Sequence, residues 1–440
     1  MSLPSPEVLR SLGLDPKDYE KKEVKTVEEL LKKPPHVILA QVFRNCDLLF
    51  DDKTKISLKK GSVMVMDSGL FLSAKRGNDD RRVHLKPYRR TFSEFFNRYR
   101  GQSLDDKHLL VWRYGGLGDL IFSQPVIKYL KEKYPTCSIT YATAFKNKQL
   151  LESWPKGLID TITEIPFNKS LLMNSDYHLT FEGFIERCRE SCFQNAYDVF
   201  SKAANVQIDQ TDDKYYPELL VDEKSSNKFK EIVPDNFIVV QIRATSPLRM
   251  MPFSKWKIII EKLNELGFNI VVVDDEGYED RYNKLFIENK MNRDKIFNLC
   301  RYSKSIKDAI SVINHSHGVI AIDSSFIHIA AALKKPVVGI YAPFLAETRM
   351  KYYKDSDWVE PKESECKLFP CFLHYKRTYE CPSFRAGKEI TCFSPISETE
   401  VVDKFLKLVE EKVKVRESND STTDRPHEKS IEESSSVFSG

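Results

Sequence analysis

The chain has 440 residues, of which 41% are hydrophobic and 30% are charged. This length exceeds that of one ordinary domain and predicts two or three, each with its own core. The formal net charge of +4 provides no argument from overall charge for nucleic-acid binding. No apolar run of roughly 18 residues predicts a membrane span. The N-terminus lacks a secretory pattern, and nine mostly scattered cysteines favour a reducing compartment. We therefore expect a cytoplasmic protein.

The first 107 residues are predicted to form an extension and a small module. Residues 1–35 are polar and form the extension, while residues 36–107 have the strand and turn pattern of a small β-rich module. Basic and aromatic residues at 86–98 predict either an amphipathic helix docked on this module or a surface for an acidic acceptor. The strands of the module are expected at 36–43, 55–58, 62–66, 70–73 and 83–85.

From residue 108 onward, short apolar strands alternate with amphipathic helices. Unbroken apolar strands between helices are typical of parallel sheets covered on both faces. We therefore predict an α/β fold with two doubly wound domains facing a cleft, at residues 108–230 and 231–413, followed by a disordered tail at 414–440. Strands are expected at 109–113, 138–142, 159–165, 177–181, 237–242, 269–274, 318–322 and 337–341. Helices are expected at 119–133, 146–154, 184–202, 255–266, 304–314, 325–333 and 401–413.

A glycine-rich turn joins the first predicted strand of this region to its helix. The turn runs from Arg113 through Gly115, Gly116 and Gly118 to Asp119. Glycines let backbone N–H groups approach a ligand, and a helix N-terminus favours negative charge. Asp119 can either cap the helix or take a proton from a bound hydroxyl. The turn lacks the G-x-G-x-x-G spacing and the Walker lysine, which weakens dehydrogenase and phosphate-loop interpretations.

Three places in the second domain are candidate ligand sites, because each follows a buried strand. Hydroxyl and cationic groups at Thr245, Ser246 and Arg249 suit phosphate oxygens, although a loop with capping hydroxyls gives the same pattern. The acidic turn at 274–277, which includes Glu276, suits sugar hydroxyls or is a solvated turn. At the third place, polar residues end a strand and begin a helix, whose free N–H groups suit a phosphate. One turn into that helix lies a histidine, which either faces the same ligand or is a core residue. The residues of this third place are Asp323, Ser324, Ser325 and His328.

Four cysteines occur within a short stretch near the end of the second domain. Their spacings differ from paired C-x-x-C knuckles, so structural zinc, buried or loop thiols and disulfides all remain interpretations. These residues are Cys366, Cys371, Cys381 and Cys392.

Taken in order, the glycine turn and the later Asp-Ser-Ser-Phe-Ile-His motif resemble glycosyltransferase family nine, the ADP-heptose:lipopolysaccharide heptosyltransferases. The resemblance covers residues 108–412 and implies the GT-B fold, with the acceptor on the first domain and the donor on the second. It implies an inverting, metal-independent transferase without a cofactor, in which an ADP-sugar is the favoured donor. Asp119 would be the general base. The donor would be bound by Thr245, Ser246, Arg249, Asp323, Ser324, Ser325 and His328, with Glu276 as an approximate nucleotide-side carboxylate.

The default reaction is therefore heptose transfer to lipopolysaccharide core or another glycan. A lipid-linked glycan acceptor would bring the protein into peripheral contact with a membrane. A second hypothesis moves the acceptor to a protein or a modified nucleic-acid base, on the basis of the extra β module and the basic segment near Arg90. A third is a non-catalytic protein that binds a nucleotide-sugar or a partner. The presence of both Asp119 and His328 argues against this third hypothesis.

Overall fold

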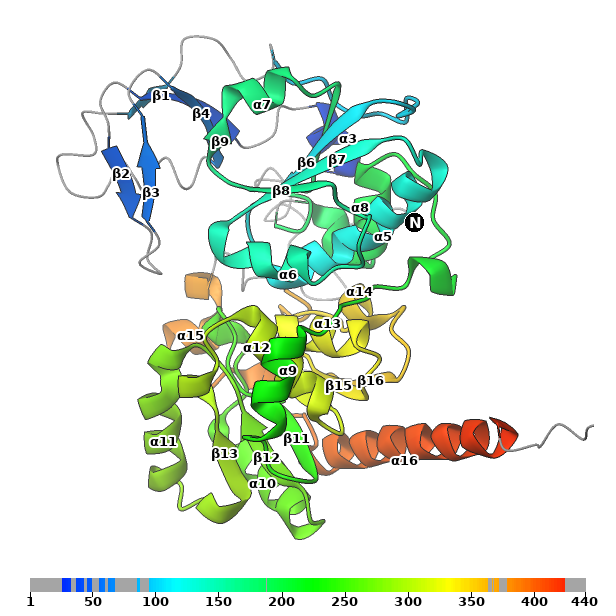
Figure 1. The fold of residues 1–440 in the computed structure, drawn as a ribbon. Helices are drawn as coiled ribbons and strands as arrows, with labels where there is room; N and C mark the ends of the chain where they lie inside the picture. Colours follow the sequence, from blue (N-terminus) through cyan, green and yellow to red (C-terminus); the bar gives the residue numbers. More distant parts are fainter. Residues whose placement is uncertain are drawn as a thin grey trace, which may run out of the picture.

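The structure is a computed structural model of the chain, and it describes residues 26–32, 37–42, 46–49, 55–59, 62–67, 85–87, 95–186, 188–362, 366, 368–371 and 378–423. Figure 1 shows two α/β domains, one above the other, with a small β structure beside the upper one. Within the described residues, no helix is both long and apolar enough to cross a membrane.

The first domain contains a four-stranded parallel sheet in the order β10-β6-β7-β8. Helices α5 and α8 pack on one face, where Leu109 and Val111 of the central strand join the larger core. The strands are β6 (His108–Arg113), β7 (Ser138–Thr143), β8 (Thr161–Glu164) and β10 (Tyr177–Thr180). The helices are α5 (Leu117–Lys133), α6 (Lys148–Glu152), α7 (Lys169–Met173) and α8 (Ala196–Ala203).

The small N-terminal module covers the other face of that sheet. Its antiparallel sheet has the order β5-β1-β4-β9, and β9 (Phe167–Asn168) comes from the first domain itself. Val65 of the module packs in one cluster with Leu110 and Trp112 of β6. Since a parallel sheet needs apolar cover on both faces, the module completes the first domain. The other strands of the module are β1 (Val37–Val42), β2 (Cys46–Leu49), β3 (Lys55–Leu58), β4 (Val63–Asp67) and β5 (Leu85–Pro87). Helix α3 (Val27–Lys32), from the predicted extension, packs on α8 instead, with Val27 in the larger core.

Two predictions for this module need comment. The predicted strand at 70–73 lies outside the described residues. The helix predicted at 86–98 is wrong for the described part of that segment: residues 85–87 form β5, and Arg98 makes a β-bridge with His178. The edges of two sheets provide hydrogen-bond partners here, which overrides a helical pattern of side chains.

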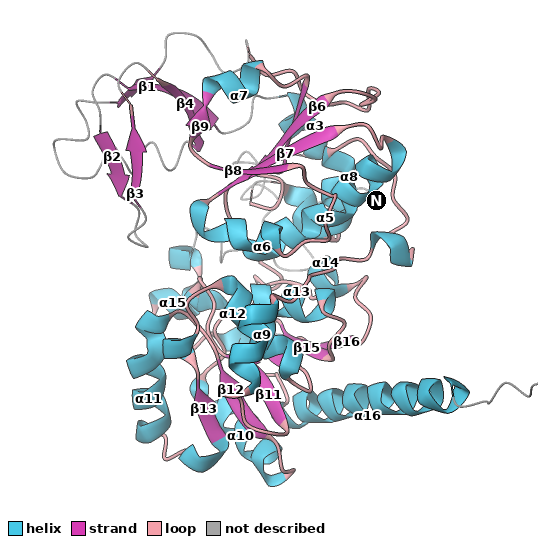
Figure 2. Ribbon diagram, viewed as in Figure 1, coloured by secondary structure: helices cyan, strands magenta, loops and turns pink. Residues whose placement is uncertain are grey.

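The second domain is a six-stranded parallel sheet in the order β13-β12-β11-β14-β15-β16 with helices on both faces (Figure 2). This confirms the doubly wound α/β prediction. The strands are β11 (Phe237–Gln241), β12 (Asn269–Val272), β13 (Ile296–Asn298), β14 (Val319–Ile322), β15 (Val337–Ile340) and β16 (Ser356–Val359). The helices are α9 (Glu223–Lys230), α10 (Phe253–Glu265), α11 (Glu279–Glu288), α12 (Ile306–His315), α13 (Ser325–Ala332), α14 (Glu347–Met350), α15 (Pro382–Arg385) and α16 (Glu398–Thr423).

Three predicted boundaries differ from the structure. Helix α8 begins at Ala196, whereas the sequence predicts a helix from residue 184. Helix α9 packs on α12, with Ser226 bonded to His315, so this helix belongs to the second domain and the boundary precedes it rather than following residue 230. Helix α16 continues to Thr423, beyond the predicted start of a disordered tail at 414. Lys414, Arg416 and Glu417 favour helix, and a helix that has already formed extends cooperatively into the weaker helix formers at 418–423. Residues 424–440 lie outside the described residues.

The two domains meet through a buried chain of polar side chains. The Tyr197 hydroxyl on α8 donates to the Tyr353 hydroxyl at 3.2 Å, and Tyr353 lies 2.8 Å from Nδ1 of His328 on α13. Beside it, the Tyr352 hydroxyl donates to the Asp198 carboxylate of α8. These contacts hold α13 against the first domain.

Replacing Tyr353 by Phe is expected to lower the free energy of unfolding by about 1–3 kcal/mol, because it leaves buried polar groups on Tyr197 and His328 without their partner. Urea denaturation measures this change. The matched control is Tyr379→Phe, whose side chain is exposed, and it should leave the midpoint unchanged. Equal stability of both variants would contradict a structural role for the chain of hydroxyls.

Candidate active site

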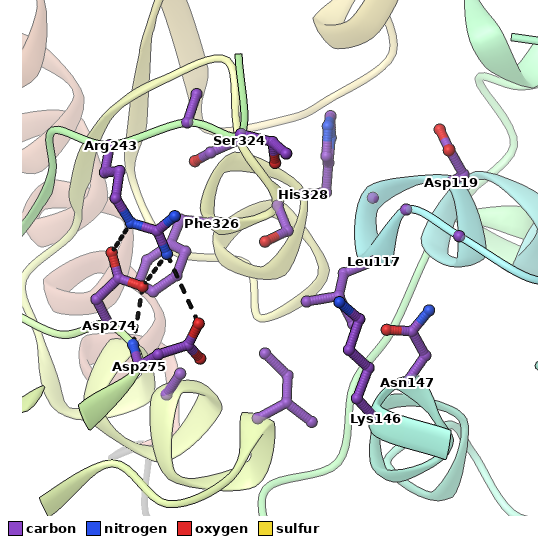
Figure 3. Close-up of a pocket in the computed structure, with 18 of the residues that line it drawn as sticks. Leu117, Asp119, Lys146, Asn147, Arg243, Asp274, Asp275, Ser324, Phe326 and His328 are labelled. Carbon is purple, nitrogen blue, oxygen red and sulfur yellow. Dashed lines mark hydrogen bonds and ion pairs between the residues drawn. The ribbon is translucent and has the colours of Figure 1, made fainter. Parts of the chain in front are cut away.

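A cleft of about 1770 Å³ lies between the two domains. Its lining comes from the carboxyl ends of strands in both sheets, where doubly wound folds bind ligands. The first domain contributes the glycine turn and the start of α5, and the second contributes the loops after β11 and β14 and the start of α13 (Figure 3). The cleft therefore brings both predicted motifs together.

The glycine turn permits two close approaches that a side chain would block. Gly116 is the N-cap of α5 with φ 76°, and a Cβ there would overlap the Asp119 carboxylate. A Cβ on Gly118 would overlap the His328 ring across the domain boundary. Among the described residues, no side-chain hydrogen bond caps α5, and Asp119 lines the cleft.

Arg113, predicted as part of the turn, is a buried hub beneath it with only 1% of its surface exposed. Its guanidinium pairs with Asp119 through Nη2. It also holds Glu186 by both terminal nitrogens, with Nη1 donating to Oε2 at 3.0 Å. Glu182 lies 3.5 Å from Nη1 and accepts the backbone N–H of Tyr114. One cation is therefore surrounded by three carboxylates.

Burial and the neighbouring Glu186 raise the pKa of Asp119, while Arg113 and Arg349 act in the opposite direction. The net direction is upward from the ordinary value. A carboxylate with a raised pKa is a stronger base than an ordinary aspartate, and this is the property that a general base requires.

The opposite wall presents buried polar atoms without a partner among the described residues. They are the hydroxyls of Ser246 and Ser324 and Nε of Arg249. Ser324 is the N-cap of α13, so the unbonded N–H groups of that helix begin beside it. Thr245 and Ser325 also line the cleft. This combination of hydroxyls, a cation and a helix N-terminus suits an oxyanion such as a phosphate.

Asp323 and His328 lie in this wall, and each is bonded to another side chain of the protein. The Asp323 carboxylate accepts from Nη1 of Arg249 at 2.6 Å, so Asp323 orients the cation. Burial lowers the pKa of His328 to about 4, which makes the ring neutral near pH 7. Since Tyr353 can donate to Nδ1, we assign the ring proton to Nε2, where it is available as a hydrogen-bond donor.

The acidic turn after β12 is already paired. Arg243 donates to Oδ2 of Asp274 at 2.7 Å and lies over the ring of Tyr278, 3.7 Å from its centre. Glu276 is exposed and bonded to Lys304 at 2.6 Å. Figure 3 shows Arg243 between Asp274 and Asp275 at the edge of the cleft. The predicted carboxylate Glu276 is thus on the cleft, with a cation attached.

Several cleft residues were missed in the sequence. Arg349 on α14 is buried, lines the cleft and donates to the carbonyls of Ser191 and Thr348. Glu182 and Glu186 follow strand β10, which lies next to β6 in the sheet. A carboxylate directly after the predicted strand 177–181 was a usable signal for Glu182. Glu186 lies in the segment predicted as a helix, and nothing near Arg349 in the sequence indicates its position across the cleft.

The four clustered cysteines do lie together. They line one small cavity of about 20 Å³ with Leu248, Pro343, Leu368, Phe369, Pro382 and Ile390. Burial and the other three thiols raise the pKa of Cys392. However, no group of three or more His, Cys, Asp or Glu in the described part of the chain is arranged to hold a metal ion. Cys381 and Cys392 are buried while Cys366 and Cys371 are partly exposed, so the apolar lining fits buried or loop thiols, and structural zinc stays a prediction.

Comparison with known proteins agrees with this geometry. Residues 185–367 match the family model glycosyltransferase family 9 (heptosyltransferase). This range includes the cleft wall with Ser246, Arg249 and Ser324 and excludes the glycine turn. No curated protein matches the chain.

Solved structures show the same fold at low sequence identity. A family 9 glycosyltransferase from Veillonella parvula is 16% identical, with TM-score 0.52, over 71% of this chain and 99% of its own. The Escherichia coli ADP-heptose lipopolysaccharide heptosyltransferase II is 14% identical, with TM-score 0.51, over 70% and 99%. TibC of enterotoxigenic E. coli, described as an iron-containing dodecameric glycosyltransferase, is 12% identical, with TM-score 0.51, over 86% and 93%.

The family match and the shared fold confirm the predicted resemblance, fold class and enzyme class. The chain is a glycosyltransferase that carries a family 9 domain in a two-domain α/β fold.

Proposed function

We propose that the protein transfers a sugar from a nucleotide-diphosphate sugar to an acceptor hydroxyl, with inversion at the anomeric carbon. The observation that carries this proposal is the division of the cleft: a base candidate, Asp119, stands on one wall, and the unpartnered polar atoms of Ser246, Ser324 and Arg249 stand on the other. Heptose from an ADP-sugar is the favoured donor, because two of the similar structures are a heptosyltransferase and a family 9 enzyme.

In the proposed reaction, Asp119 takes the proton of the acceptor hydroxyl as its oxygen attacks the anomeric carbon. The bond between that carbon and the diphosphate oxygen breaks, and a nucleoside diphosphate leaves with the electron pair. Arg249, the Ser246 and Ser324 hydroxyls and the N-terminus of α13 stabilise the negative charge on the diphosphate. These groups supply that stabilisation without a metal, so metal independence belongs to the proposal. The iron of TibC is a property of that protein.

The acceptor is proposed to be a glycan, with lipopolysaccharide core as the default. On the acceptor side of the cleft, the Phe145 ring is 50% exposed and offers an apolar surface to a sugar ring. Lys146 beside it is exposed and faces the cleft (Figure 3). A cytoplasmic location, and peripheral contact with a membrane that carries the acceptor, follow from this proposal.

Replacing Asp119 by Asn is expected to reduce turnover at least about 100-fold, because the amide cannot accept the proton. Donor affinity, measured by calorimetry, should change less than twofold, since the donor binds the other wall. Asp106→Asn, on the surface of the same domain, is the matched control. Normal turnover in Asp119→Asn would contradict the proposed base.

The pH profile of turnover tests the environment of Asp119. The base must be ionised to work, and its pKa is raised. Activity should therefore fall on the acid side at a pH above the ordinary aspartate pKa of about 3.9. An acid limb at or below that value, in initial rates measured on protein shown to remain folded, would exclude this carboxylate as the group that titrates.

Replacing Arg249 by Met is expected to weaken binding of the nucleoside diphosphate about 10- to 100-fold, the loss of a hydrogen bond to a charged group. Thermal shift against nucleotides and nucleotide-sugars first identifies the ligand, and titration calorimetry then compares the variants. Arg281→Met, an exposed arginine of α11, should bind as the unaltered protein does. Unchanged affinity in Arg249→Met would place the diphosphate elsewhere.

A metal chelator should leave turnover within twofold of its untreated value. The measurement is initial rate before and after dialysis against the chelator, with metal added back. Loss of activity that a divalent or ferric ion restores would contradict metal independence.

A further inference from the structure

All five N–H donors of Arg113 are hydrogen-bonded, and their partners fix where its guanidinium can hold Asp119. Nε donates to the Gly115 carbonyl at 2.9 Å and Nη1 to the Phe181 carbonyl at 3.1 Å. The remaining donors go to Glu186, through both Nη1 and Nη2, and to Asp119, through Nη2. The two backbone carbonyls fix the plane of the guanidinium, so the position of Asp119 is set by a group that cannot rotate.

Arg113 holds only one of the two oxygens of Asp119. The bonded atom is Oδ2, and Oδ1 accepts no hydrogen bond from the residues that the structure describes. Asp119 also lines the cleft, with 16% of its side chain exposed. One oxygen is thereby anchored and the other is left for a ligand in the cleft.

An arginine beside a catalytic base makes that base weaker, because its positive charge stabilises the ionised carboxylate and lowers the pKa. Glu186 offsets much of this effect. It forms a bidentate pair with the same guanidinium, and its own charge acts on Asp119 in the opposite direction. The other charged or titratable groups around Asp119 are Glu182 after β10, Arg349 on α14, His328 on α13 and Tyr141 on β7.

We propose that Arg113 and Glu186 are positioning residues for the transfer reaction: their bidentate ion pair anchors Oδ2 of Asp119 and leaves Oδ1 directed at the acceptor hydroxyl. Glu186 lets Arg113 orient the base while offsetting the positive charge that would weaken it. This proposal rests on the proposed function, since it assigns Asp119 the role of base.

The test measures Asp119 directly. The Cγ resonance of 13C-labelled aspartate is assigned by its absence in Asp119→Asn and titrated with pH in the full chain. In Glu186→Gln the amide keeps the shape but loses the charge, so the pKa of Asp119 should fall by about one unit, the effect of removing one adjacent like charge. The acid limb of turnover should move by the same amount, and turnover near pH 7 should fall with donor KM unchanged.

The matched control is Glu182→Gln on the same loop. Its carboxylate contacts Arg113 at a longer distance and is bonded to the Tyr114 backbone. It should shift the pKa of Asp119 less than Glu186→Gln does. A second variant, Arg113→Lys, keeps the charge but cannot serve both carboxylates and carbonyls. It should lower kcat about 10-fold or more, within the range that a misplaced catalytic group costs. The thermal midpoint of each variant verifies that it folds.

The outcomes separate the two proposals. A pKa of Asp119 and a turnover in Glu186→Gln equal to those of the unaltered protein, together with an inactive Asp119→Asn, would overturn the positioning role and leave the proposed function standing. Full kcat in a folded Arg113→Lys would also overturn it. A fully active Asp119→Asn would instead overturn the proposed function.

Discussion

The placement of Arg113 at the end of β6 constrains much of the cleft wall that carries the glycine turn and Asp119. A buried guanidinium requires a partner for every donor, and here the partners come from the glycine turn, from α5 and from the loop after β10. The turn must then curl back over Arg113, which places Asp119 against Gly116 and excludes a side chain there. The same requirement brings Glu182 and Glu186 into the cleft. A single buried charge therefore organises three segments that are far apart in sequence.

The small N-terminal module has a structural reason to be present. Helices α5 and α8 of the first domain pack on one face of its sheet, and Leu110 and Trp112 project from the other face. The module, with β9 paired directly to β4, closes that face. It therefore supports β6, the strand that carries Arg113. The module thus supports the cleft wall that carries Asp119 from the side of the sheet away from α5.

Sequence patterns predicted the larger part of this architecture, for physical reasons that individual elements illustrate. Strand β14 and helix α13 follow from an unbroken apolar run and a serine at the start of a helix, both local signals. In the described part of the segment 86–98 the predicted helix is absent, because sheet edges, which are non-local, pair with residues 86–87 as part of β5 and with Arg98 in a bridge. The domain boundary failed because α9 docks on α12, a contact that no local pattern contains.

The site was predictable in its residues more than in their roles. Asp119, Ser324 and His328 were identified from two motifs, and both motifs face one cleft. The pairing of Asp323 with Arg249, the neutral state of His328 and the approach of Arg349 depend on burial and on contacts between domains. Four cysteines close in sequence also proved close in space, yet their surroundings are apolar and the described residues offer no metal-holding arrangement. Spacing alone could not separate these cases.

The proposed reaction requires one wall of the cleft to hold the leaving diphosphate while the other holds the base. The most direct measurement is a crystal structure of the protein with the nucleoside diphosphate that binds it best. We expect the diphosphate at the N-terminus of α13, bonded to Arg249 and to the hydroxyls of Ser246 and Ser324. Oδ1 of Asp119 should face the space where the sugar would lie. A diphosphate bound at the glycine turn or outside the cleft would contradict the proposed reaction.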